Sequence, residues 1–185
     1  MEQVRLSLDL DQDRARFLLH DSHTLDLPSL FYGSLRAPEI FEIVVGRPME
    51  SATIEPVSLD GHELARIIAG DGFPGIFPAE TEDSLSCLLI SDLSPLESLR
   101  VAWFEWEEYK LGRFSLTDGR TAQAFVPNID VIRALHGSID FHPWSFEEWR
   151  DQHLVGAIPN AQVWMAEMPD VTAMLAENEK RAAAE

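Results

Sequence analysis

The chain has 185 residues, is 45% hydrophobic and carries a formal net charge of −18. This length and composition fit one domain that can bury a sizeable core and fold alone. The charge promotes solubility and disfavours nucleic acid or an anionic membrane surface as partner, because their phosphate groups would be repelled. No apolar run approaches the roughly 18 residues of a membrane helix.

The start of the chain and its cysteine content indicate the compartment. MEQVRLSLDLDQD has neither the basic nor the apolar segment of a secretory signal, so none is expected. The single cysteine, Cys87, excludes an internal disulfide. A reducing compartment, the cytoplasm, is therefore the expected location.

Residues 1–28 are expected to form an N-terminal extension. Apolar and polar residues alternate in VRLSLDL, which predicts a strand, and the following RARFLLH fits either a hairpin partner or a short helix. Leu30 and Phe31 then lead into YGSLR. A short helix is predicted from Pro38, with Gly46 as its stop.

The middle of the chain alternates predicted strands and loops. Two strands are expected within 52–68, interrupted by a turn signal at Asp60-Gly61. The stretch DGFPGIFPA, 71–79, contains two glycines and two prolines and predicts an irregular loop. SLSCLLISDL, 84–93, reads as a strongly apolar strand, in which Cys87 is a core residue.

A helix should follow that strand. Ser94, Pro95 and Glu97 form a capping box, and apolar residues recur at helical spacing up to Phe104, which places Glu105 at or just past the helix end. RFSLTDGRTAQAF predicts a hairpin that turns at Asp118-Gly119. Helices are expected after Val126-Pro127, one of them opened by a second capping box from Ser145 to Glu148. From Pro169 the tail is expected to be a fraying helix.

Several common kinds of site are disfavoured. The six histidines, with no cysteine pair and no HExxH, read as scattered surface residues and predict no metal site. Ser34 follows Gly33, but the G-x-S-x-G pattern of a serine hydrolase is absent. Glycine-rich nucleotide-binding signatures are missing as well.

Two stretches remain as candidates for chemistry. FYGSL ends a strand shortly before a helix, so its N–H groups form either an anion cradle or a plain turn. WFEWEEYK sets Glu105, Glu107 and Glu108 among aromatic residues. Glu105 directly follows the apolar helix face and is the acid most expected to point inward. Desolvation there would raise its pKa towards neutrality, which suits a general base.

In this order the stretches resemble the γ-glutamylcyclotransferase-like family, in its avirulence-induced plant and bacterial branch. The shared motifs are Y-G-S/T-L, an F/Y-P-G loop and F-E-G-x-E-Y, and the resemblance covers about residues 29–155. In the last motif Glu105 matches the family's catalytic glutamate, Glu108 matches its second glutamate, and Glu107 matches a variable position. Trp106 stands where the family usually has glycine, and Lys110 where arginine is common.

The resemblance implies an α+β fold, a small mixed-strand β-barrel flanked by short helices with a pocket at one barrel mouth. Residues 29–127 would form this domain, and 128–185 a helical C-terminal arm packed on it. The implied reaction closes a γ-glutamyl group to 5-oxoproline and releases an amine or amino acid, with no metal or organic cofactor. Glu105 would be catalytic. The residues expected to bind the substrate are Tyr32, Gly33, Ser34, Leu35, Phe73, Pro74, Gly75 and Tyr109.

Some alternatives stay open. The chain is either such a cyclotransferase or a non-catalytic relative that uses the pocket as a small-ligand or protein-binding module, because fold does not guarantee function. An amidase that uses Ser34 is the third possibility. The partner of the enzyme would be a small γ-glutamyl compound whose leaving group the residues do not name, and the oligomeric state is open too. Trp106 either lines the pocket or packs near Trp144 and Trp149.

Overall fold

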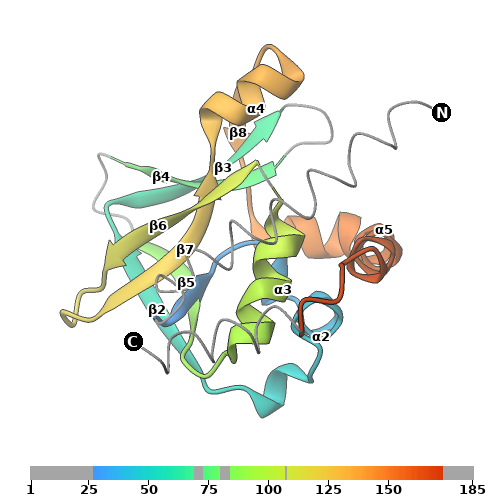
Figure 1. Cartoon of the computed structure of the whole chain (residues 1–185). Coiled ribbons are helices and arrows are strands. Elements are labelled where there is room, and N and C mark those ends of the chain that lie inside the picture. Colours follow the sequence, from blue (N-terminus) through green and yellow to red (C-terminus); the bar gives the residue numbers. More distant parts are fainter. Residues whose placement is uncertain (1–26, 69–72, 80–83, 107, 173–185) are drawn as a thin grey trace, which may run out of the picture.

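The computed structural model describes residues 27–68, 73–79, 84–106 and 108–172. Within them two sheets and four α-helices form an α+β fold, as the sequence predicts (Figure 1). The expected strand at 4–10, the undecided RARFLLH segment and most of the tail helix lie outside the described residues.

The larger sheet has five strands in the order β2-β5-β1-β7-β6. Its strands are β1 (Ser29–Phe31), β2 (Ile54–Asp60), β5 (Ser84–Ile90), β6 (Tyr109–Ser115) and β7 (Thr121–Pro127). β1 runs antiparallel to β5 and parallel to β7, so the sheet is mixed, as expected. β6 and β7 form the predicted hairpin, with Gly119 at φ 87° in its turn.

The smaller sheet has three strands in the order β4-β3-β8. They are β3 (His62–Ile68), β4 (Phe73–Pro78) and β8 (Asp140–Pro143). β2 and β3 confirm the two strands expected within 52–68. The Asp60-Gly61 turn carries the chain from one sheet to the other, because β2 pairs with β5 while β3 pairs with β4 and β8.

Two strands depart from the sequence-based expectations. The segment predicted as an irregular loop contains β4, which pairs with β3 from Phe73 to Pro78. Pro74 and Pro78 are four residues apart, so their backbone nitrogens lie on the same edge of β4. β4 is the outer strand of its sheet, where a missing N–H donor is tolerated. β8 also interrupts the region expected to be helical, because it completes the ladder of β3.

The two sheets do not close into a barrel. Among the described strands they share no ladder. β4 instead brings Gly75 against Pro127 at the end of β7, where a side chain on Gly75 would collide with the proline ring. Prolines on both strands lack the N–H groups that a connecting ladder would need.

The helices follow their predicted start and stop signals. Short 3₁₀ turns, η2 (Ser34–Arg36) and η3 (Met49–Ser51), flank α2 (Pro38–Val45), which ends at Gly46 with φ 95°. The other helices are α3 (Pro95–Glu105), α4 (Ile129–His136) and α5 (Phe146–Ala166). Both halves of the Ser94 capping box are present; at α5, Ser145 accepts a hydrogen bond from the Glu148 N–H. No helix in the described ranges is long and apolar enough to span a bilayer.

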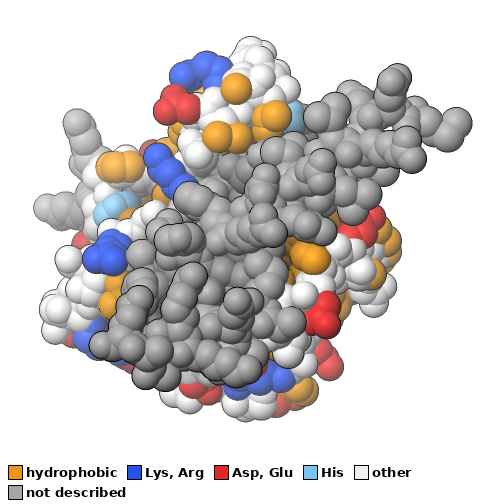
Figure 2. Space-filling view, viewed as in Figure 1, with side chains coloured by type: hydrophobic (Ala, Val, Ile, Leu, Met, Phe, Trp, Pro, Cys, Tyr) orange, Lys and Arg blue, Asp and Glu red, His pale blue; other side chains and the backbone are white. Residues whose placement is uncertain are grey.

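Helices α2, α3 and α5 lie together against one side of the five-stranded sheet, and α4 lies at the opposite end near β8 (Figure 1). Apolar side chains are exposed over α4 beside charged ones (Figure 2).

Successive side chains of β1 point to opposite faces of the sheet and so belong to two parts of the core. Phe31 packs with the helices, whereas Leu30 and Tyr32 pack with Ile76 of the smaller sheet. This alternation places Tyr32 between the sheets.

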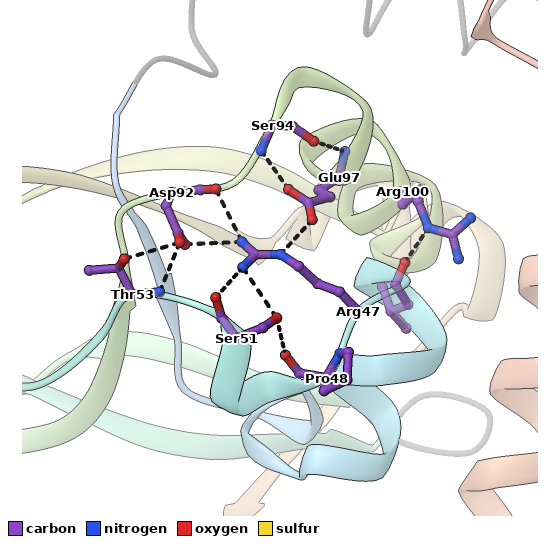
Figure 3. A network of polar contacts seen from close by, with 9 residues as sticks. Arg47, Pro48, Ser51, Thr53, Asp92, Ser94, Glu97 and Arg100 are labelled. Atoms are coloured by element: carbon purple, nitrogen blue, oxygen red, sulfur yellow. Dashed lines mark hydrogen bonds and ion pairs between the residues drawn. The ribbon is translucent and has the colours of Figure 1, made fainter.

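A polar network around Arg47 holds the start of α3 in place (Figure 3). Its guanidinium donates to Glu97 Oε1 at 2.6 Å, to the Ser51 carbonyl at 2.8 Å and to Asp92 Oδ1 at 3.0 Å. Asp92 also accepts from the N–H and hydroxyl of Thr53. Arg47 thus connects the end of α2 to η3, to the segment after β5 and to the N-terminus of α3, and Asp92 extends the network to the segment before β2.

We expect Cys87 to be unreactive in the folded protein. Its side chain is buried, and burial raises the pKa of the thiol to about 11. Thiolate is the reactive form, so an aromatic disulfide reagent at pH 8 should label native protein far more slowly than protein unfolded in urea. Because the folded pKa exceeds the unfolded one, this burial stabilises the fold below about pH 9 and loses that effect as the pH rises towards 11. Equal labelling rates for native and unfolded protein would contradict the burial of this thiol.

Candidate active site

An open cavity of about 150 Å³ lies where the end of β1, β4, the C-terminal end of α3 and α5 meet. Its walls include Tyr32 to Leu35, Pro74, Glu105 and Tyr109, which come from all three motifs of the resemblance. Segments about 70 residues apart in sequence are therefore brought together around one cavity.

Two of the expected binding residues flank Pro74 in β4. Gly75 does not line the cavity; it permits the close approach of β4 to Pro127. Of Phe73 only the strand position, opposite Ile67, is described. Sequence reasoning missed Phe125 of β7 and Trp164 of α5, which also line the cavity. No local motif marks either residue, because only the packing of α5 and the pairing of β7 bring them here.

The YGSL stretch forms one wall. Gly33 precedes η2, and its carbonyl accepts from the Arg36 N–H at 3.1 Å. Among the described turns and loops, no backbone carbonyl accepts a hydrogen bond from the N–H groups of Gly33, Ser34 or Leu35. The first N–H groups of a helical turn have no partner within it and are satisfied by solvent or a ligand. They are thus available to an anionic group in the cavity.

Two tyrosines place hydroxyl groups at the cavity. Tyr32 donates to the Phe125 carbonyl at 2.5 Å, and Tyr109 donates to the Pro74 carbonyl at 2.7 Å. Burial raises the pKa of both phenols well above 10, and the negative charge of Glu105 raises both further. Both hydroxyls therefore remain protonated at neutral pH, with the Glu105 carboxyl close enough to influence them.

Glu105 is the last residue of α3 and is half-buried in the cavity wall, where sequence reasoning expected it. Glu108 lines the same cavity, and its side chain is 13% exposed with Oε1 3.5 Å from His136 Nε2. None of the described cavity-lining residues is Lys, Arg or His. An anionic group bound here would therefore depend on N–H and O–H donors rather than on a basic side chain.

Trp106 both lines the cavity and packs in the core. Its indole stacks on that of Trp164, with ring centres 6.2 Å apart and planes 10° apart, and meets Trp103 edge-on. Trp103 Nε1 also donates to the Trp164 carbonyl at 3.1 Å, so these rings join α3 to α5. The neighbours expected for a core position, Trp144 and Trp149, pair with each other instead.

The backbone of Trp106 has φ 56° and ψ −174°, a conformation suited to glycine. A glycine here would adopt this conformation without strain. We expect Trp106→Gly to be more stable than Trp106→Ala by about 1 to 2 kcal/mol. Both changes remove the indole, but only alanine keeps the strained Cβ. Urea midpoints of the two variants measure the difference, and an alanine variant as stable as the glycine variant would contradict the strain.

No group of three or more His, Cys, Asp or Glu side chains suited to a metal ion occurs among the described residues. No family model matches the chain, and no curated protein matches it.

Solved structures are similar in chain path. The solution structure of At5g39720.1 from Arabidopsis thaliana shares 22% identity over 72% of this chain and 87% of its own, with a TM-score of 0.43. That of At3g28950.1, also from Arabidopsis thaliana, shares 17% over 86% of this chain and 87% of its own, with a TM-score of 0.46. The crystal structure of c4763, a uropathogenic E. coli-specific protein, shares 17% over 70% of this chain and 95% of its own, with a TM-score of 0.41.

Proposed function

We propose that this protein is a γ-glutamylcyclotransferase-type enzyme, which closes the γ-glutamyl group of an amine or amino acid conjugate to 5-oxoproline. The observation that carries the proposal is the position of Glu105 in a small cavity, which it lines together with two protonated phenols and with Gly33 to Leu35. These are the groups that the motif resemblance assigns to substrate and proton handling.

In this mechanism the N–H groups of Gly33, Ser34 and Leu35 hold the α-carboxylate of the substrate. Glu105 takes a proton from the α-ammonium group, and the free amine attacks the γ-carbonyl carbon. Glu105 delivers this proton to the leaving nitrogen as the C–N bond breaks. It then takes the second proton that the ring nitrogen must lose and passes it to the released amine, which leaves as an ammonium group. Atoms balance without water, metal or redox partner.

The arrangement of the cavity suits such a reaction. The nucleophile is tethered to its electrophile, so the main task is to fold the substrate into a five-membered ring geometry. Much of the cavity wall is apolar or aromatic, which suits the carbon skeleton of a glutamyl group. Donors next to the γ-carbonyl would stabilise the developing oxyanion.

A screen of γ-glutamyl compounds with separate detection of 5-oxoproline and free glutamate tests the proposal. Release of 5-oxoproline with an equal amount of amine is the expected result. Free glutamate in place of 5-oxoproline would indicate an amidase that uses Ser34. Binding of γ-glutamyl compounds without any product would identify the alternative, a non-catalytic small-ligand module.

A further inference from the structure

Glu108 is the second acidic residue that lines the cavity around Glu105. Its side chain is only 13% exposed. Its negative charge raises the pKa of the Tyr109 phenol, as the charge of Glu105 does. Both carboxylates therefore lie near the hydroxyl that Tyr109 donates to the Pro74 carbonyl. In the proposed mechanism Glu105 has a role and Glu108 has none.

His136 meets the Glu108 carboxylate from outside the cavity. Its Nε2 lies 3.5 Å from Glu108 Oε1, and His136 is not among the described residues that line the cavity. It is the last residue of α4, which ends where the Gly137 N–H donates to the Arg133 carbonyl. A positive charge is favourable beside the last carbonyl groups of a helix. Both the helix end and the carboxylate thus favour the protonated form of this imidazole.

The backbone holds this pair in place beside the cavity. The Glu108 carbonyl accepts the Asn128 N–H at 2.6 Å, directly before α4 begins. Buried Ile132 packs α4 against Ile67 of β3. Because α4 is attached both to the segment that carries Glu108 and to the smaller sheet, the imidazole and the carboxylate stand on parts of the fold that are fixed relative to each other.

We propose that Glu108 binds the α-ammonium group of the substrate and that His136 positions Glu108 for this task. The inference rests on the proposed cyclisation. A glutamyl group carries an α-carboxylate, for which the cavity offers N–H groups, and an α-ammonium group with three N–H donors. Glu105 accepts one of these donors and takes its proton, whereas Glu108 accepts another, whose proton stays on the nitrogen.

This division of roles orients the nucleophile. Once Glu105 has taken its proton, the lone pair of the amine lies where that N–H bond was, and the hydrogen bond to Glu108 keeps the nitrogen from turning. Such alignment is what a tethered attack requires. A second carboxylate in the cavity is costly when it has no partner, because burial removes its hydration. His136 offsets this cost from outside and leaves the side of Glu108 that faces the cavity to the substrate.

The test measures how strongly the cavity prefers a ligand with an amino group. L-Methionine sulfone has the length of a γ-glutamyl amide but carries a sulfone in place of the γ-carbonyl, so it cannot cyclise. 4-(Methylsulfonyl)butanoate is the same compound without the amino group. By calorimetry the unaltered protein should bind the first at least about tenfold more tightly than the second, because a hydrogen bond between charged groups is lost. Glu108→Gln should reduce this preference to below about threefold.

His136→Ala should lower the preference by about threefold, with the affinity for the compound without the amino group unchanged. His136→Gln should retain more of the preference than His136→Ala, because its amide can donate from near the position of Nε2. His142→Ala is the matched control. His142 Nε2 lies 3.1 Å from Asp140 Oδ2 in an exposed pair outside the cavity, so its removal should leave both affinities unchanged.

Equal weakening of both compounds by His136→Ala would show a structural effect on the cavity and would overturn the proposal. So would an unaltered protein that shows no preference for the amino compound or binds neither compound. Formation of 5-oxoproline from γ-glutamylmethylamide is measured separately. If none forms but the preference depends on Glu108 and His136 as expected, the cyclisation fails and the positioning role stands. If 5-oxoproline forms and His136→Ala leaves the preference intact, only the positioning role fails.

Discussion

Replacing Glu105 by glutamine is expected to lower the rate of 5-oxoproline formation by about 10²- to 10⁴-fold, the usual contribution of a general acid–base group. The amide keeps the size of the side chain at the end of α3, so the melting temperature should change by only a few degrees. It cannot accept a proton, however, and the attacking amine would stay protonated. Initial rates with a cyclised γ-glutamyl substrate, together with thermal unfolding curves, measure both quantities.

Glu107→Gln is the matched control, because it removes one negative charge from the same WFEWEEYK stretch, two residues beyond Glu105. Its rate should stay close to that of the unaltered protein. A Glu105→Gln variant with near-normal kcat would remove Glu105 from the mechanism, whatever the control shows. Equal losses in the two variants would instead indicate a general effect of charge near the cavity.

Replacing Arg47 by methionine is expected to lower the free energy of unfolding by about 2 kcal/mol. Methionine keeps the apolar stem but removes the donors to Glu97, Asp92 and the Ser51 carbonyl. Glu97, whose side chain is 16% exposed, would then lose its ion pair with Arg47 and keep its hydrogen bonds with Ser94 in the capping box. Urea denaturation at pH 7 measures the loss.

The loss should depend on pH in a defined direction. Burial alone would raise the pKa values of Asp92 and Glu97, but their hydrogen bonds outweigh burial and lower both. Their contribution is therefore present above the unfolded pKa of about 4 and is lost as the pH falls through the folded pKa. Arg47→Met should consequently be closest to the unaltered protein in acid. A difference in stability that grows below pH 4 would contradict this assignment.

Arg120 provides the control for this experiment. It also contacts two carboxylates, Glu55 and Asp118, at 2.7 and 2.6 Å, but its side chain is 42% exposed. Ion pairs in water contribute little to stability, because solvent screens the charges. Arg120→Met should therefore cost much less than Arg47→Met. Equal losses would show that the position of Arg47 between four segments has no special effect.

Elements whose ends depend on local chemistry could be predicted from the amino-acid sequence. The helix from Pro95 to Glu105 follows from a serine that caps its own first turn, and the end of α2 follows from a glycine that accepts a positive φ. The β6–β7 hairpin follows from the Asp118-Gly119 turn. For the same reason the position of Glu105 at the end of a helix was predictable, since it depends on counting turns from a cap.

Which distant segments meet could not be predicted in this way. β4 was predicted as a loop from its prolines and glycines, yet it is a strand because both prolines face the outer edge and Gly75 fits against Pro127. β8 exists because β3 offers it an edge, and Trp164 joins the cavity because α5 packs on α3. The orientation of Trp106 likewise follows from its stacking on Trp164. Contacts of this kind depend on pairing between segments far apart in the chain, which local propensity and periodicity do not encode.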